Sequence, residues 1–306
     1  MLCQRTIRAP VYALSVGVHT GKKVAMTLRP APADTGIRFV RTDLGRPRVV
    51  RALARNVSDT TLSTSILENG VQVATVEHLM SALWGLGIDN LVVELSDEEV
   101  PIMDGSAAPF VQLIEGIGIQ ELPAPRQFVR ITRAIEVSQG GATAALRPYD
   151  GFRAAYTFVA DHPVFNRYPK RVEVDFASTS YVAEVSRARS FGLIDELEKA
   201  HAINRCLGSS LENAVGIDDA RILNTEGLRY EDEFVKHKVL DAIGDLYLLG
   251  KPVIGAFEGY MSGHALNNKL ARALLRVDDA WEVVTAGKGA VPEAALAASA
   301  YSGAAN

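Results

Sequence analysis

Cysteine is scarce in this chain of 306 residues, which contains only Cys3 and Cys206. The two are far apart and match no Cys-x-x-Cys spacing, so the sequence predicts neither a disulfide framework nor a zinc site built from thiolates. Long apolar runs are also missing, because no stretch reaches the roughly 18 to 20 residues that a membrane span requires. We therefore expect a protein of a reducing compartment, located in the cytoplasm, without stable insertion into a membrane.

A secretory signal is not expected at the N-terminus either. Arg5 and Arg8 precede an apolar run over residues 9–18, as they would in a signal peptide, but Pro10 and Tyr12 interrupt that run. The residues that follow are more typical of a turn and a second strand.

Charge of one sign is not in large excess, since 32 basic residues face 36 acidic ones and leave a net charge of -4. This balance argues against nonspecific binding to nucleic acid, although a local basic pocket for an anionic small molecule remains compatible with it. Hydrophobic residues make up 48% of the chain and charged residues 22%, as in globular proteins. The length is sufficient for two hydrophobic cores.

The order of predicted elements occurs twice along the chain. Each half begins with extended segments that end in Leu-Arg-Pro, and each continues with a helix, a strand, a loop and a second helix. In sequence order, these elements are 6–30, 75–85, 90–95, 103–107 and 110–115 in the first half, and 128–148, 232–250, 252–257, 261–265 and 267–276 in the second.

This repeat predicts an α+β protein with two similar domains that arose by internal duplication. Each domain would be a sheet with helices packed on one face, and the active site would lie where the domains meet. The alternative is that a common order of elements occurs twice by coincidence. We predict a first domain over residues 1–122, a linker over 123–127 and a second domain over 128–280. A segment around 186–215 is inserted in the second domain, and 281–306 would be a C-terminal tail with a flexible end.

The helix expected over residues 232–250 carries His237, Asp241 and Asp245 at intervals of four. Each is rotated by only about 40° from the one before, so all three can face one cleft. Apolar residues occupy most of the remaining circumference, which predicts a buried helix. A buried histidine and two buried carboxylates need a partner, which would be a metal ion, another charged group, or both.

His78 is the natural third ligand if the partner is a metal ion. Two imidazoles and one carboxylate, with an open position for water, form a typical catalytic zinc set, and His237 and Asp241 supply the other two ligands. Glu77 directly precedes His78, where a carboxylate could serve as general base for a metal-bound water. The alternative is that His237 and Asp241 form only a salt-bridged surface pair. None of the six histidines belongs to a His-Glu-x-x-His motif.

His264 follows a glycine in a loop that opens a helix, where it is either a functional histidine or merely a structural one. Asp245 could hold its imidazole protonated and oriented, which would make His264 an acid or an oxyanion stabiliser. Lys238 could pair with a phosphate, although a lysine on a helix is more often only solvated. The other three histidines, His19, His162 and His201, belong to no comparable group.

Five segments together resemble one family, the zinc-dependent UDP-3-O-acyl-N-acetylglucosamine deacetylases. They are Thr75-Val-Glu-His-Leu-Met, Pro101-Ile-Met-Asp-Gly-Ser-Ala-Ala-Pro-Phe, Ser186-Arg-Ala-Arg-Ser-Phe-Gly, the stretch 232–250, and Ser262-Gly-His-Ala-Leu-Asn-Asn. The resemblance extends in order from about Arg5 to the region of Trp281. It implies hydrolysis of the 2-acetamido group of a UDP-linked, 3-O-acylated glucosamine with release of acetate, the committed step of lipid A synthesis in Gram-negative bacteria.

The resemblance also implies a role for each matched residue. The zinc ligands would be His78, His237 and Asp241. The general base would be Glu77, the catalytic acid His264, and the carboxylate partner of that acid Asp245. Ser190 stands where many members have a threonine whose hydroxyl helps to hold the oxyanion, and it keeps the hydroxyl without the methyl group.

Substrate contacts are expected from the inserted segment and its surroundings. Phe191, Leu193, Leu211 and Leu62 would bind the acyl chain, and Lys238 would offset the charge of the diphosphate. Leu193 occupies a position that is often phenylalanine in the family, and Ser63 one that is cysteine in some members. The partners would be the substrate and water, and the protein would be a monomer. The alternatives are a zinc amidase acting on another acylated sugar nucleotide and a noncatalytic module that binds a lipid or a nucleotide.

Overall fold

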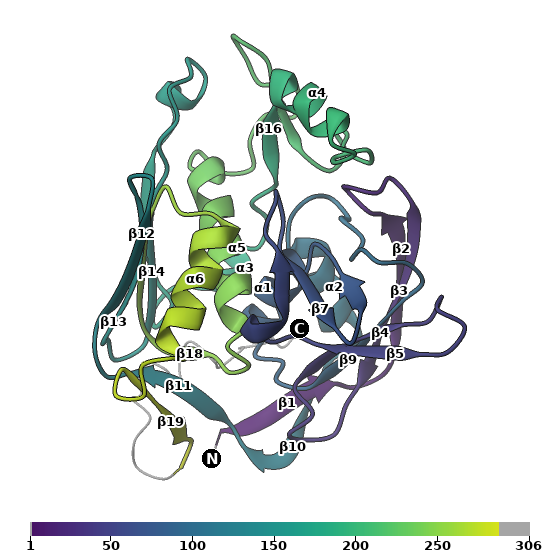
Figure 1. Ribbon diagram of the computed structural model, residues 1–306, viewed down its shortest axis with the longest axis vertical. Coiled ribbons are helices and arrows are strands. Elements are labelled where there is room, and N and C mark those ends of the chain that lie inside the picture. The colour runs from purple at the N-terminus through teal and green to yellow at the C-terminus, as the bar shows by residue number, and fades with distance from the viewer. Residues whose placement is uncertain (1, 288–306) are drawn as a thin grey trace.

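The computed structural model describes residues 2–287, which form two large sheets with helices between them and three small sheets of two or three strands. Figure 1 shows most of the helices in the middle of the molecule, with one large sheet on either side. A single large hydrophobic cluster contains buried residues of both halves, so the helices of the two halves share a core. The predicted α+β architecture is therefore confirmed. The part of the prediction that falls on residues 288–306 lies outside the described residues.

The sheet of the first half has five strands in the order β2-β3-β9-β4-β5. Their bounds are β2 Val11–Val16, β3 Lys23–Pro30, β4 Ile37–Arg41, β5 Arg48–Arg51 and β9 Leu91–Leu95. Only β4 and β9 are parallel, and the other neighbours run antiparallel. Apolar residues alternate along β3, with Val24, Met26 and Leu28 fully buried, as expected for a strand with one face on the core.

The sheet of the second half has seven strands. Their bounds are β11 Gln127–Ile131, β12 Ile135–Gln139, β13 Ala142–Arg147, β14 Phe152–Thr157, β15 Arg171–Asp175, β18 Val253–Tyr260 and β19 Trp281–Thr285. Five strands of this sheet repeat the pairing seen in the first half, because their order β12-β13-β18-β14-β15 corresponds to β2-β3-β9-β4-β5. Among these five only β14 and β18 are parallel, as β4 and β9 are in the first half. This shared connectivity is what an internal duplication predicts, and the duplication itself remains an inference.

The helices also follow the predicted order. They are α1 Glu77–Leu86 and α2 Ala108–Ile117 in the first half, and α3 Tyr181–Glu184, α4 Ile194–Ala202, α5 Glu233–Tyr247 and α6 His264–Leu274 in the second, with short 3-10 turns η1 Ala54–Asn56 and η2 Phe165–Arg167. The two loops that precede α2 and α6 share an unusual backbone feature. Met103 and Met261 both adopt a left-handed conformation, with φ of 57° and 52°.

Two of the predicted boundaries differ from the structure. Residues 123–127, predicted as a linker, belong to strands β10 Ile119–Pro125 and β11, and Arg126 between them is buried against Asp89. Strand β10 pairs with β1 Cys3–Ile7 in a two-stranded ribbon. The predicted tail begins too early, because residues 281–285 form β19, which pairs with β11.

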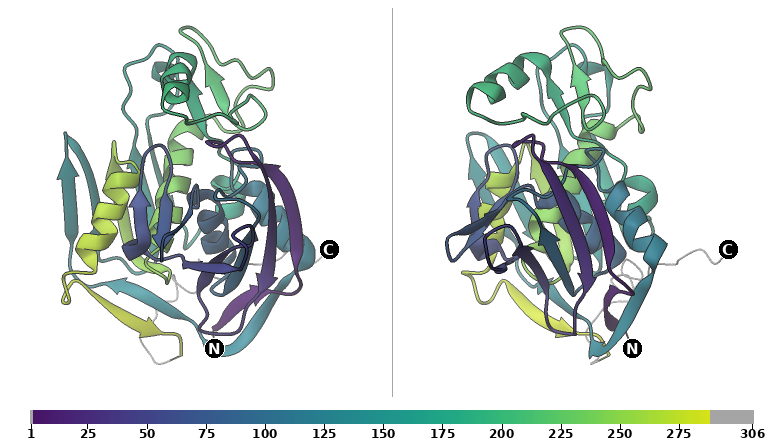
Figure 2. Two further views of the ribbon diagram at one scale, coloured as in Figure 1. Left: turned by 45° about the vertical axis from the view of Figure 1, so that its right-hand side comes forward. Right: turned by 90° about the vertical axis from the view of Figure 1, so that its right-hand side faces the viewer.

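The inserted segment forms a cap at one end of the molecule (Figure 2). It contains α4 and the parallel strands β16 Phe191–Leu193 and β17 Val215–Ile217. A small sheet of β6 Val57–Asp59, β7 Ser65–Glu68 and β8 Val71–Val73 leads into α1. None of the helices described between residues 2 and 287 has both the length and the apolar composition needed to cross a bilayer.

Candidate active site

His78, His237 and Asp241 meet where α1 and α5 pack against each other. The Nε2 atoms of His78 and His237 lie 3.5 Å and 3.3 Å from Oδ1 of Asp241. All three side chains are buried, and their potential ligand atoms lie within 4.8 Å of one another. Metal–ligand bonds of about 2.0–2.1 Å in a tetrahedral zinc site place the ligand atoms roughly 3.4 Å apart. The group therefore has the spacing of a metal site.

Neighbouring groups orient the three side chains towards a common centre. The ring nitrogen Nδ1 of His237 lies 3.1 Å from the carbonyl oxygen of Ala188, which leaves Nε2 for the centre. Lys238 donates to Oδ2 of Asp241 at 2.9 Å, whereas the buried Oδ1 has no hydrogen-bond partner among residues 2–287. A buried carboxylate oxygen without a donor is unfavourable unless a cation occupies the position beside it.

The protonation states suit a metal as well. Burial lowers the pKa of His237 to about 3, so its imidazole is neutral. Burial would raise the pKa of Asp241, but the neighbouring ammonium group of Lys238 helps to hold it well below its usual range. A neutral imidazole and an ionised carboxylate are the forms that bind metal ions.

Gly244 lets α5 approach α1 closely enough to assemble this group. A Cβ atom at this position would lie 2.0 Å from the carbonyl oxygen of Glu77 and 3.0 Å from its Cα atom. Since Gly244 follows Asp241 by three residues on the same helix, the point of closest approach lies beside the group of His78, His237 and Asp241.

Glu77 lies beside His78 at the start of α1 and is fully buried. Its Oε2 atom accepts a hydrogen bond from the backbone N–H of Thr64 at 3.0 Å. Burial raises the pKa of Glu77, although the neighbouring charge of His264 acts in the opposite direction. A raised pKa brings a carboxylate closer to the range in which it can accept and release a proton.

His264 lies opposite Glu77, with its Nε2 atom 3.9 Å from Oε1 of that residue. Its other ring nitrogen, Nδ1, lies 3.0 Å from Oδ2 of Asp245. Burial opposes protonation of the ring, but Asp245 and Glu77 more than compensate and raise the pKa of His264 to about 10. Asp245 is in turn held by Thr64, whose hydroxyl donates at 2.6 Å, and by the side-chain amide of Asn267 at 2.9 Å.

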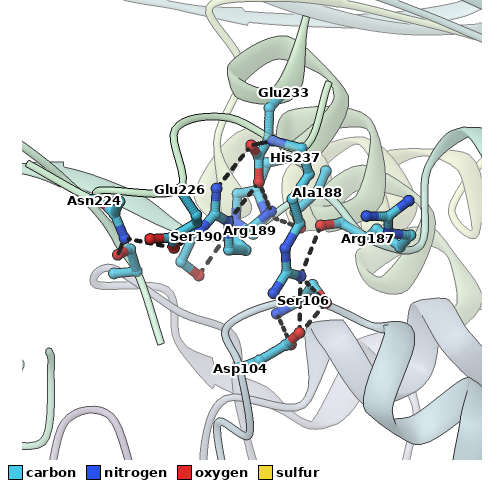
Figure 3. A network of polar contacts seen from close by, with 12 residues as sticks. Asp104, Ser106, Arg187, Ala188, Arg189, Ser190, Asn224, Glu226, Glu233 and His237 are labelled. Atoms are coloured by element: carbon cyan, nitrogen blue, oxygen red, sulfur yellow. Dashed lines mark hydrogen bonds and ion pairs between the residues drawn. The ribbon is translucent and has the colours of Figure 1, made fainter. Parts of the chain in front are cut away.

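Ser190 lies on the cap side of the site, with its hydroxyl oxygen 3.4 Å from Nε2 of His237. The residue before it anchors this segment to α5 (Figure 3). Arg189 is buried, and its Nε atom donates to Oε1 of Glu233 at 2.8 Å. Because Arg189 also follows Ala188, this ion pair fixes both the hydroxyl of Ser190 and the carbonyl group that orients His237.

A cavity of about 550 Å³ connects this centre to the cap. Its wall includes every predicted site residue except Asp245, which lies behind His264. The residues predicted to bind the substrate all line it, namely Lys238, Phe191, Leu193, Leu62 and Leu211. Apolar side chains of α4 and β17 continue the wall beyond them. Ser63 also lines it, and its buried hydroxyl has no partner within the described part of the chain.

Sequence reasoning missed several residues of the site. His19, which was assigned to no group, lines the cavity, and its buried Nε2 atom has no hydrogen-bond partner among the residues that the structure describes. Thr64, Asn267 and the pair of Arg189 and Glu233 were also not identified. Arg189, Glu233 and Asn267 were detectable only as polar residues inside matched segments, whereas His19 and Thr64 gave no signal of their type or spacing.

The chain is similar to known proteins over most of its length. The sequence model of the family described as UDP-3-O-acyl N-acetylglycosamine deacetylase matches residues 4–276. Proteins named UDP-3-O-acyl-N-acetylglucosamine deacetylase from Marinobacter nauticus and Chromohalobacter salexigens are 56% and 58% identical to this chain over 285 residues. A third, from Hahella chejuensis, is 56% identical over the same length. In each case the alignment covers 93% of this chain and 94% of the relative.

Proposed function

The chain belongs to the UDP-3-O-acyl N-acetylglycosamine deacetylase family, and from this premise we propose that it hydrolyses the acetamido group of UDP-3-O-acyl-N-acetylglucosamine, with release of acetate, in lipid A biosynthesis. One observation supports the proposal above all. A group with the geometry of a metal site lies at one end of a largely apolar cavity, with a carboxylate and a protonated histidine on opposite sides.

The metal is proposed to be zinc, held by His78, His237 and Asp241. Oδ1 of Asp241, which lacks a hydrogen-bond partner in the described part of the chain, and the convergent Nε2 atoms of the two imidazoles fit such an ion. When bound, zinc would lower the pKa of a water molecule and polarise the amide carbonyl group of the substrate.

Glu77 is proposed to accept the proton of the attacking water. Its carboxylate is fixed by the N–H of Thr64 through Oε2, which leaves Oε1 directed towards the side where His264 lies. The water oxygen attacks the acetamido carbonyl carbon, and negative charge develops on the carbonyl oxygen. Positioned hydrogen-bond donors stabilise such charge, and Ser190 and the cationic ring of His264 are the available donors.

His264 is proposed to complete the reaction by donating its Nε2 proton to the leaving nitrogen as the carbon–nitrogen bond breaks. Asp245 makes this possible because it accepts from Nδ1 and keeps the ring protonated. The products are acetate and the free 2-amino sugar. Base and acid therefore come from the two halves of the chain, Glu77 from α1 and His264 from α6.

The apolar arm of the cavity is proposed to hold the 3-O-acyl chain. Phe191, Leu193 and Leu211 line this arm, and each methylene group that is buried there contributes about 0.8 kcal/mol. Lys238 is proposed to offset the charge of the diphosphate. In the structure its ammonium group donates a hydrogen bond to Asp241, and Lys238 lines the same cavity. The cytoplasmic location and the monomeric state remain predictions.

The proposal is tested by measuring acetate release from the substrate by zinc-loaded protein, alongside an analogue without the acyl chain and an isomer with a different sugar. We expect release from the acylated N-acetylglucosamine compound, with KM rising strongly when the acyl chain is missing. Faster release from the isomeric sugar would favour an amidase for another sugar nucleotide. Tight binding of the substrate without acetate release would favour a binding module.

A further inference from the structure

Glu99 is a fully buried carboxylate that lies outside the set of residues assigned so far. Four hydrogen bonds reach it from neutral groups. Oε1 accepts from the backbone N–H of His19 and from the hydroxyl of Thr75, each at 2.9 Å. Oε2 accepts from the backbone N–H and the hydroxyl of Thr20, also at 2.9 Å. A buried carboxylate with this many donors rigidifies the segments that supply them.

Thr75 is held in a strained conformation two residues before Glu77. Its φ of 57° lies in the left-handed region, which a β-branched residue rarely adopts because the conformation is strained. The surrounding structure must therefore enforce it. The hydroxyl bond to Glu99 does so, and so do backbone bonds of the two adjacent residues, from Ala74 to Glu98 and from Val76 to Thr64.

The start of α1 depends on this turn because it has no side-chain cap. The N-cap position of α1 is Val76, which offers no hydrogen-bonding side chain. Glu77 and His78 are the first two residues of the helix. The direction in which the chain leaves Thr75 therefore sets where their side chains point.

The second segment held by Glu99 is the loop that carries His19. A Cβ atom at Gly17 would lie 2.2 Å from Oε2 of Glu99, so only glycine allows the loop to come this close. The same loop supports the cap, because the carbonyl groups of Val18 and His19 accept from the N–H groups of Gly208 and Leu207. Glu99 thus joins the cap side of the cavity to the helix that carries the base and one metal ligand.

We propose that Glu99 is a positioning residue for the reaction, which holds Thr75 in its left-handed conformation so that Glu77 and His78 face the metal centre. The proposal rests on the proposed function for its effect on turnover, but its effect on metal binding is independent of the substrate. Glu99 lines neither the cavity nor the metal site itself, and it acts through Thr75.

The first comparison uses two substitutions of Thr75 with Glu99 intact. Thr75→Val removes the hydroxyl that donates to Glu99 and keeps the branched side chain, so the left-handed turn loses a restraint and keeps its strain. Thr75→Gly also removes the hydroxyl, but glycine adopts positive φ without strain. We expect Thr75→Val to weaken zinc binding about tenfold, as measured by competition with a chelator, and Thr75→Gly to weaken it much less.

The second comparison combines both positions. Glu99→Gln keeps the size of the side chain but replaces one acceptor oxygen with a donor group. It should weaken zinc binding about tenfold and lower kcat at least as much, with KM within about threefold. Adding Thr75→Gly to Glu99→Gln should restore a large part of both losses. The matched control is Asp89→Asn. The carboxylate of Asp89 accepts hydrogen bonds from Arg126 and from the backbone N–H of Arg5 in another part of the fold.

A purely structural role gives a different result. In that case Glu99→Gln would lower the unfolding temperature, as Asp89→Asn does, but would leave zinc affinity and kcat unchanged. Unchanged zinc affinity and kcat overturn the proposal. Equal zinc affinity of Thr75→Val and Thr75→Gly, or an undiminished effect of Glu99→Gln in the Thr75→Gly protein, overturns it too. If the wild type releases no acetate, the proposed function fails, and the zinc measurements still decide the role of Glu99.

Discussion

Replacing Gly244 with alanine would place a methyl group between α5 and α1, directly against the backbone of Glu77. The new Cβ atom would lie 2.0 Å from the Glu77 carbonyl oxygen, whereas ordinary contacts begin at 3.4 Å. Backbone cannot rotate away, so the helices must separate by roughly 1.4 Å at this point. Overpacking of this kind costs about 1–3 kcal/mol, which a gain of at most about 1 kcal/mol in helix propensity offsets only partly.

The larger effect is expected on the chemistry. A displacement of about 1 Å between catalytic groups lowers turnover by roughly 100-fold, and here it would separate Glu77 and His78 from the proposed metal ligands on α5. Acetate release and zinc content should both be measured, with unfolding in denaturant as a check on folding. Gly116→Ala is the matched control, because no described residue other than the neighbouring backbone of its own helix lies within 4 Å of a Cβ atom there, and alanine should stabilise α2 slightly. Wild-type turnover and zinc affinity in the Gly244→Ala protein would refute the reasoning.

Three further outcomes are expected. Asp245→Asn removes the charge that keeps His264 protonated, so the decrease in kcat at alkaline pH should begin about 1–3 pH units lower than in the wild type. A pH–rate profile at saturating substrate measures this shift, and an unchanged profile would contradict the role of His264 as acid. Arg189→Met leaves the buried carboxylate of Glu233 without its partner and should lower the free energy of unfolding by about 3–5 kcal/mol, measured in denaturant. Leu211→Asp places a charge in the apolar arm of the cavity and should raise KM for the acylated substrate with little change in kcat. A loss confined to kcat would contradict the proposal that this arm binds the acyl chain.

Local pattern was sufficient to predict the parts of the fold that depend on periodicity. The stripe on α5 follows from the four-residue spacing of His237, Asp241 and Asp245, and all three are buried. The repeated order of elements predicted two sheets of the same kind, and their strand pairings agree. The third ligand, His78, could be proposed because the repeat placed α1 opposite α5.

The parts that sequence reasoning missed depend on contacts between distant segments. Prolines at 123 and 125 indicated a linker, but the chain there forms one strand of a two-stranded ribbon, where a missing N–H donor is tolerated. Residues 281–285 become a strand only through pairing with β11, more than 140 residues earlier. Within the site, Thr64 reaches both Glu77 and Asp245, a role that no property of a single threonine predicts.

The central claim is that Glu77 acts on the proton while His237 holds the metal. It is tested most directly by measuring zinc content and acetate release together in the wild type, Glu77→Ala and His237→Ala. We predict that Glu77→Ala retains zinc and loses turnover by about 10²- to 10⁴-fold, whereas His237→Ala loses both. Wild-type turnover in the Glu77→Ala protein, or full zinc content with turnover in the His237→Ala protein, would contradict the account.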